Sequence, residues 1–270
     1  MLAAVAAAGA DAIRFAATYR SPDAQRNLIA ACRTARLACV LEISEADAVS
    51  SAAADTPWLA TTPSDISNGP LLLEFARAHR PILLAIGAAS DAEIREALGV
   101  IAFGYVQSPA SVPHPRGFRE AFRSAAGKAA LADKVTLLHD RLDLAALAER
   151  TRTFELPVGL YDAFGGAAVA AAAVALGARV IVKPADESFA ATVSAIRDVE
   201  MALHSGPRPQ PETRKALVTL APIAPGEMFT PTNLGLRLAP AKGVSPMALW
   251  SYLGKPSARG YQAGEMIDPA

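Results

Sequence analysis

Short apolar runs rich in β-branched residues alternate along the first three quarters of the chain with longer segments that carry apolar residues at helical spacing. Seven of these runs predict β-strands: Ala12–Ala17, Ala38–Ile43, Trp58–Thr62, Pro81–Gly87, Val135–Asp140, Pro157–Asp162 and Arg179–Pro184. Helices are predicted between them at Ser21–Ala35, Pro70–Ala78, Asp91–Leu98 and Leu142–Thr153. This alternation favours an α/β fold, a TIM-type (β/α)8 barrel that lacks one strand, over an open doubly wound sheet.

The pattern changes after residue 204. Ser205–Pro211 is rich in proline, and it predicts a linker over residues 205–214. The sequence therefore divides into a barrel at residues 1–204 and a second, small domain at residues 215–270.

Composition and charge exclude several classes of partner. The 270 residues are 52% hydrophobic, which suffices for a buried core, and 26 basic residues balance 26 acidic ones. A net charge of zero gives no field that would attract nucleic acid or an anionic membrane. Met1–Ala10 has no basic n-region and reads as the end of a helix stopped at Gly9, and no apolar run reaches the roughly 18 residues of a membrane span. Cys32 and Cys39 suit reduced, packed thiols, so we expect a cytoplasmic protein.

Two segments near the end of the predicted barrel resemble the signature of the sialic acid synthase family. Val158–Gly166 reads VGLYDAFGG and Gly177–Pro184 reads GARVIVKP, where the family has G-[YF]-S-D-H-T-x-G and G-A-x-x-I-E-K-H. The resemblance implies that both family histidines hold a divalent metal, Mn or Mg. Their positions are Ala163 and Pro184 in this chain, and neither side chain has a lone pair to donate. The resemblance thus predicts a catalytically degenerate member without a metal cofactor.

The second domain resembles the antifreeze-like (SAF) domain that follows the barrel in this family. The segments that carry the resemblance are GEMFTPTNL, at residues 226–234, and GVSPMALW, at residues 243–250. The resemblance implies a β-rich fold and a homodimer in which each SAF domain covers the neighbouring barrel and donates an arginine to it. Ala239 stands at the position of that arginine, and Arg237 or Lys242 could substitute for its charge.

The resemblance also implies a reaction, the condensation of phosphoenolpyruvate with an N-acetylated sugar such as N-acetylmannosamine. Catalytic candidates at matching positions are Asp65, His139 and Asp162, and candidates for substrate binding are Arg14, Asn68, Lys183 and Arg237. Structural roles compete with these: His139 as a hydrogen-bonded core residue, Asp162 as a helix cap, and Lys183 as a structural lysine rather than a Schiff-base nucleophile.

The segment at residues 99–134 is much longer than the connection that the family has at this point, and it contains Pro109, Pro113 and Pro115. Val100–Val106 could form a strand that plugs the incomplete barrel. The simpler interpretation is a continued helix followed by a proline-rich surface loop.

Three functions follow from these observations. The first is a non-catalytic partner or sugar-phosphate binder in nonulosonic acid and surface-glycan biosynthesis. The second is an active synthase whose site is rebuilt from Arg14, Asp65, His139, Asp162 and Lys183. The third is a protein-binding platform in which aromatic residues of the long segment, Phe103, Tyr105, Phe118 and Phe122, are exposed anchors. The loss of charges and metal ligands favours the first.

Overall fold

The chain folds into two compact units, Met1–His204 and Ser205–Ala270. The structure, a computed structural model, describes residues 2–16, 21–53, 56–141, 143–163, 166–204, 213–240 and 242–269. Residues 205–212 of the predicted linker (205–214) lie outside these ranges. No helix in the described ranges is long and apolar enough to cross a membrane.

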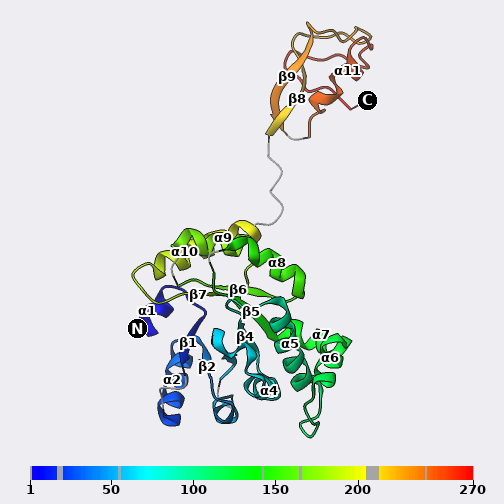
Figure 1. The fold of residues 1–270 in the computed structure, drawn as a ribbon. Coiled ribbons are helices and arrows are strands. Elements are labelled where there is room, and N and C mark those ends of the chain that lie inside the picture. The colour runs from blue at the N-terminus through cyan, green and yellow to red at the C-terminus, as the bar shows by residue number, and fades with distance from the viewer. Residues whose placement is uncertain are drawn as a thin grey trace. The chain divides into compact units, whose positions relative to one another are not determined.

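The first unit is built on seven parallel strands that follow one another in chain order and curve into an open half-barrel surrounded by helices (Figure 1). The strands are β1 (Ala12–Ala16), β2 (Ala38–Glu42), β3 (Trp58–Ala60), β4 (Ile82–Ala85), β5 (Val135–His139), β6 (Val158–Tyr161) and β7 (Ile181–Val182). Every predicted strand is present in shortened form, and the last residue of the first prediction, Ala17, lies outside the described ranges. The predicted α/β fold is therefore confirmed as a seven-stranded parallel half-barrel, which is consistent with a TIM-type barrel.

Helices and 3₁₀ turns connect the strands. They are α1 (Leu2–Ala7), α2 (Pro22–Thr34), η1 (Ala46–Ala48), α3 (Val49–Ala53), η2 (Pro63–Ser67), α4 (Gly69–Arg77), α5 (Asp91–Val106), α6 (Pro115–Arg123), α7 (Ala125–Lys134), α8 (Leu144–Phe154), α9 (Ala167–Ala175) and α10 (Phe189–His204). Helix α5 begins with a capping box, in which Ser90 Oγ accepts from Glu93 N at 3.3 Å and Ser90 N donates to Glu93 Oε2 at 2.8 Å.

The long segment at residues 99–134 is helical except for a loop at residues 107–114. Val100–Val106 completes α5, so the strand that could have plugged the barrel is not formed and the simpler interpretation of this part is correct. Two of the four proposed aromatic anchors, Phe103 and Tyr105, are 4% and 8% exposed. Phe118 and Phe122 are half-buried and pack on the main core. The prediction that these side chains could be exposed protein-binding anchors is therefore wrong.

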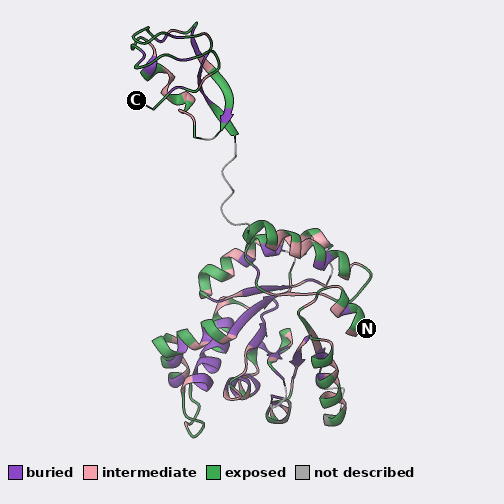
Figure 2. Cartoon of the chain, turned by 180° about the vertical axis from the view of Figure 1, so that it is seen from behind, coloured by how far each residue is buried: buried purple, intermediate pink, exposed green. Residues whose placement is uncertain are grey.

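Strand alternation separates the unit into two apolar layers. Leu41, Leu59, Leu84, Leu137 and Leu160 belong to the large core that also contains helix residues. Their neighbours on the opposite face, Val40, Ala60 and Leu83, form a separate cluster with Trp58 and Val180. The register joins Val40 to Arg14 and Trp58, and Ala60 to Glu42 and Leu83. This second set is the interior row of the barrel. Figure 2 shows the buried residues gathered on the strands and on the helix faces that cover them.

The two edges of the sheet are less buried than its centre. Within the described residues, β1 pairs only with β2 and β7 only with β6. All residues of β4 and β5 are buried, whereas β1 has one buried residue and β7 has none. A cavity of about 710 Å³ lies here, and residues of β1, β7 and α10 contribute to its lining.

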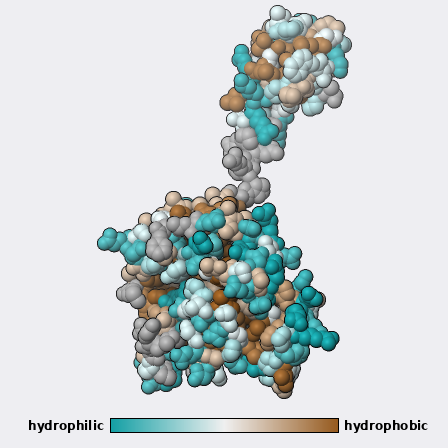
Figure 3. All heavy atoms as spheres, in the orientation of Figure 1, coloured by the Kyte–Doolittle hydropathy of each residue, from teal (hydrophilic) through white to brown (hydrophobic). Residues whose placement is uncertain are grey.

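The second unit has its own small core. Strands β8 (Thr213–Thr219) and β9 (Leu234–Pro240) pair antiparallel, and η3 (Pro246–Ala248) and α11 (Leu249–Tyr252) follow. The core is formed by Leu217, Ile223, Phe229, Leu234, Tyr252, Tyr261 and Ile267. Strand β8 begins at Thr213, inside the stretch predicted as linker. Leu238, Met247 and Trp250 of this unit are exposed. Figure 3 shows hydrophobic residues at the surface of this unit.

Candidate ligand site at the barrel mouth

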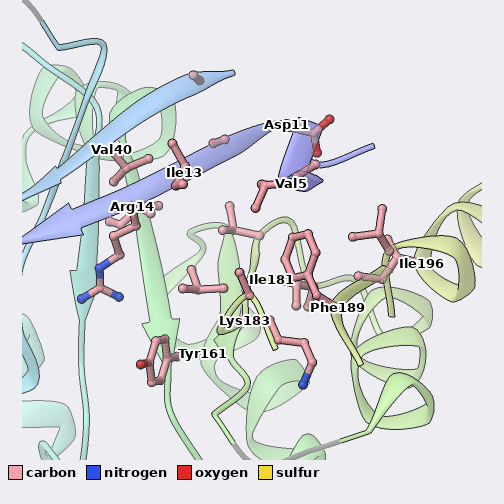
Figure 4. A pocket seen from close by; sticks show the side chains of 18 of the residues that line it. Val5, Asp11, Ile13, Arg14, Val40, Tyr161, Ile181, Lys183, Phe189 and Ile196 are labelled. Carbon is pink, nitrogen blue, oxygen red and sulfur yellow. The ribbon is translucent and has the colours of Figure 1, made fainter. Parts of the chain in front are cut away.

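The carboxyl ends of the parallel strands form a mouth in which interior-row side chains meet solvent. Arg14, Glu42, Tyr161 and Val182 all line the cavity of about 710 Å³. Figure 4 shows the Arg14 and Tyr161 side chains on the same side of their strands. Because functional groups of such barrels gather at the carboxyl ends of strands, this mouth is the candidate ligand site.

Arg14 is the central charged group of this site. Its Nη2 donates to the carboxylate of Glu42 and lies 3.4 Å from the backbone oxygen of Thr61. The guanidinium also lies 5.5 Å from the centre of the Tyr161 ring, at cation–π distance. The Arg14 and Glu42 side chains are 18% and 21% exposed, so the pair is largely shielded from water. Arg14 therefore occupies the predicted region, but an internal carboxylate already holds it.

Sequence reasoning missed three groups of the mouth, Glu42, Tyr161 and Asp140. Leu138 of β5 is in register with Gly159 of the interior row. Asp140 lies two residues after Leu138, so alternation assigns it to the same row. A methyl group placed on Gly87 would lie 3.7 Å from Asp140 Oδ2. Glu42 has a recognisable signal in the sequence, because it is the single charged residue in the apolar run Ala38–Ile43.

Asp65 and Asn68 organise the backbone between β3 and α4. Asp65 Oδ2 accepts from Thr62 Oγ1 at 2.6 Å, from Thr62 N at 3.3 Å and from Ser44 Oγ at 3.3 Å. Its Oδ1 accepts from Asn68 Nδ2 at 3.3 Å, and Asn68 Oδ1 caps α4 by accepting from Leu71 N at 3.3 Å. The hydrogen bonds of both side chains therefore stabilise η2 and α4, and their roles toward a ligand stay predictions.

His139 lies on the helix-facing row. It is in register with Leu160 of the main core and is 3% exposed. Neither ring nitrogen has a hydrogen-bond partner among the described residues, so the expectation of a hydrogen-bonded core histidine is wrong in that respect. Burial lowers the pKa of His139, against the effect of the nearby Asp140 carboxylate, which raises it.

The lowered pKa of His139 gives a testable pH dependence. Above pH 6.5 the ring is neutral in both the folded and the unfolded chain. Below that pH the unfolded chain takes up a proton that the folded chain resists, so stability falls as the pH falls, with a slope approaching about 1.4 kcal/mol per pH unit. The free energy of unfolding, measured between pH 5 and 8 for the wild type and for His139→Leu, should show a slope difference that is confined to the acid side (about one proton). Parallel curves for the two proteins would exclude this account of His139.

Asp162 and Lys183 form a buried ion pair. Lys183 Nζ lies 3.7 Å from Asp162 Oδ2, and their side chains are 5% and 0% exposed in that order. The two residues directly follow Tyr161 and Val182, which are in register on the interior row. Alternation therefore directs Asp162 and Lys183 to the opposite side of the barrel wall from Arg14. Lys183 nevertheless lines the same cavity as Arg14, whereas Asp162 is not part of its lining.

Arg237, the remaining predicted residue, lies exposed on β9 of the second unit, in register with Ala216. Its role toward a ligand stays a prediction.

Comparison with known proteins places this geometry in a family. The NeuB family model matches residues 11–184, which contain all seven strands of the barrel. The chain belongs to the NeuB family. It is 27% identical over 236 residues to the N,N'-diacetyllegionaminic acid synthase of Campylobacter jejuni, an alignment that covers 75% of this chain. The chain spans 63% of the length of that relative.

Solved structures support the fold of this NeuB family member. The spore coat polysaccharide biosynthesis protein SpsE of Bacillus subtilis matches with a TM-score of 0.56 and 19% identity, over 99% of this chain and 88% of that one. The N-acetylneuraminic acid synthetase of Leptospira borgpetersenii matches with a TM-score of 0.57 and 19% identity, over 78% and 81% of the two chains.

The residues of the mouth do not fit the divalent metal that the synthase resemblance implies. Ala163 lies two positions after Tyr161, and Pro184 lies two positions after Val182. Tyr161 and Val182 are in register on the interior row. Alternation continued past the ends of β6 and β7 would place both on the interior row, and both lack a donor atom. Across the described residues, no group of three or more His, Cys, Asp or Glu side chains could hold a metal ion. The two positions at which the synthase resemblance implies histidine ligands are therefore Ala163 and Pro184 in this member of the NeuB family.

Proposed function

We propose that this chain serves nonulosonic acid biosynthesis as a non-catalytic partner or sugar binder and does not carry out the metal-dependent condensation. Support for the pathway comes from NeuB family membership and from the similarity to a legionaminic acid synthase. The loss of catalysis is inferred from the residues of the interior row. Two of its positions, Ala163 and Pro184, hold no metal ligand, and its Arg14 is engaged by Glu42. The condensation needs a metal that activates the aldehyde and a cation that binds the phosphate. The interior row supplies neither histidine ligands for the metal nor an arginine that is available to the phosphate.

The finer features of the proposal concern assembly and location. We propose that the second unit is an SAF domain, because the GEMFTPTNL and GVSPMALW segments lie in a compact unit with an antiparallel strand pair. A homodimer in which this unit covers a neighbouring barrel would bury Leu238, Met247 and Trp250, which are 71%, 79% and 73% exposed. The free, buried thiols of Cys32 and Cys39 suit a cytoplasmic protein.

The alternative function is an active synthase with a rebuilt site. One observation favours it, because strand register and alternation assign the carboxylates of Glu42 and Asp140 to the interior row and Mg²⁺ accepts oxygen ligands. The set Arg14, Asp65, His139, Asp162 and Lys183 does not converge as a whole, since His139 and Asp162 follow the helix-facing row.

An assay of phosphoenolpyruvate consumption separates the two functions. Phosphoenolpyruvate is incubated with N-acetylmannosamine or a diacetamido sugar and Mn²⁺ or Mg²⁺, and phosphate release is followed by ³¹P NMR. The Campylobacter jejuni synthase serves as the positive control. The proposal expects no release above the enzyme-free rate. Metal-dependent release that Arg14→Met abolishes would establish the alternative.

A further inference from the structure

The barrel mouth contains a carboxylate where an anionic substrate would need a cation. Glu42 ends β2, whose other residues, Ala38, Cys39, Val40 and Leu41, are apolar. It belongs to the interior row, in register with Ala16 and Ala60, and lines the cavity. An unpaired carboxylate is costly in so shielded a position, and Glu42 is accommodated there through its pairing with Arg14.

Two other cations of the cavity lining are also matched by carboxylates of the same chain, and Arg179, a further cation of the lining, precedes β7 at the amino end of that strand. Lys183 pairs with Asp162, and Arg197 pairs with Asp11 and Glu200. Among these cations, Arg14 is the one on the interior row near the carboxyl ends of the strands. The cation best placed to bind an incoming carboxylate or phosphate at the mouth is therefore the one that Glu42 engages.

We propose that Glu42 is a specificity-determining residue that holds Arg14 and keeps carboxylates and phosphates out of the barrel mouth. The inference rests on the proposed function and names the ligand class of the same site, an uncharged sugar in place of a phosphoenolpyruvate-like anion. An anion that reaches Arg14 must displace a carboxylate attached to the neighbouring strand, which competes at high effective concentration. Even after displacement, Glu42 stays beside the anion and repels it, and such a repulsive element is how a site rejects one class of ligand.

Substitution of Glu42 should therefore create anion binding. Isothermal titration calorimetry at constant ionic strength, with phosphoenolpyruvate and inorganic phosphate as separate probes, compares the wild type with E42Q. Glutamine retains the shape of the side chain and removes its charge. We expect the Kd for phosphoenolpyruvate to fall at least tenfold in E42Q and to return to the wild-type value in the double variant E42Q with Arg14→Met.

Glu45→Gln is the matched control, because Glu45 is exposed three residues further along the chain and the substitution makes the same change in net charge. It should leave the Kd unchanged. If E42Q lowers the folded fraction, Glu42→Ser provides a second variant without the carboxylate. A folded variant at position 42 with wild-type affinity for both probes would overturn the inference. So would a wild type that binds phosphoenolpyruvate with a submillimolar Kd. The failure of E42Q to bind leaves the turnover assay unaffected, so the proposed function and this inference fail separately.

Discussion

Joint replacement of Ala163 and Pro184 by histidine is expected to create a Mn²⁺ site in a protein that otherwise binds the metal weakly. Both positions belong to the interior row, two residues beyond Tyr161 and Val182, which are in register. Imidazole nitrogen is a suitable donor for divalent transition metals. We expect the double variant to bind Mn²⁺ about 100-fold more tightly than the wild type, a difference of about 2.7 kcal/mol, as measured by calorimetry or by the loss of the free Mn²⁺ EPR signal.

The single variants Ala163→His and Pro184→His are the controls for this experiment. Each supplies one donor, so each should recover only part of the gain. A double variant that binds Mn²⁺ no more tightly than either single variant would show that the two positions do not face a common space. In that case the assignment of the interior row at β6 and β7 is incorrect.

Loss of the positive charge of Lys183 is expected to destabilise the first unit strongly. Lys183→Met leaves the Asp162 carboxylate, which is 0% exposed, without its ion-pair partner. Removal of one member of a buried pair costs about 3–5 kcal/mol, because an uncompensated charge stays in the interior. Urea unfolding followed by the fluorescence of Trp58 measures this cost, in a Trp250→Phe background that removes the tryptophan of the second unit.

Lys128→Met serves as the control, because Lys128 is exposed on α7 and its removal should change the free energy of unfolding by less than about 0.5 kcal/mol. The double variant with Asp162→Asn should be more stable than Lys183→Met alone, because the buried charge is then absent. Equal stabilities of Lys183→Met and Lys128→Met would contradict a structural role for the pair. A lysine used in catalysis could be removed with little effect on stability.

The seven strands and helices α2, α4, α5 and α8 could be predicted from the sequence because their apolar patterns are strong and local. The helix predicted at Asp91–Leu98 continues to Val106, as the simpler interpretation of residues 99–134 expected. Gly99 and Gly104 interrupt the apolar helical pattern there, and both allow close packing against neighbouring segments. A methyl group at Gly104 would lie 2.5 Å from Ala76 Cβ, and one at Gly99 would lie 3.3 Å from the backbone oxygen of Phe118. Such close helix contacts depend on tertiary structure and leave no local signal.

The candidate site was harder to predict than the fold because neighbouring residues of a strand face opposite sides. Arg14 lies on the interior row, whereas His139, Asp162 and Lys183 follow the helix-facing row. All four residues lie in or next to strands, so chain position alone suggests that they converge. Register decides which side each one faces, and a shift of one residue reverses the answer. The pairing of Glu42 with Arg14 could not be predicted, because the two residues are 28 positions apart in the chain.

Anomalous diffraction from crystals of the wild-type chain grown with Mn²⁺ and phosphoenolpyruvate tests the central claim most directly. We predict no anomalous peak in the space enclosed by Arg14, Tyr161 and Val182, and an Arg14 that still contacts Glu42. A Mn²⁺ peak in that space, with phosphoenolpyruvate bound to Arg14 and Glu42 turned away, would contradict the account.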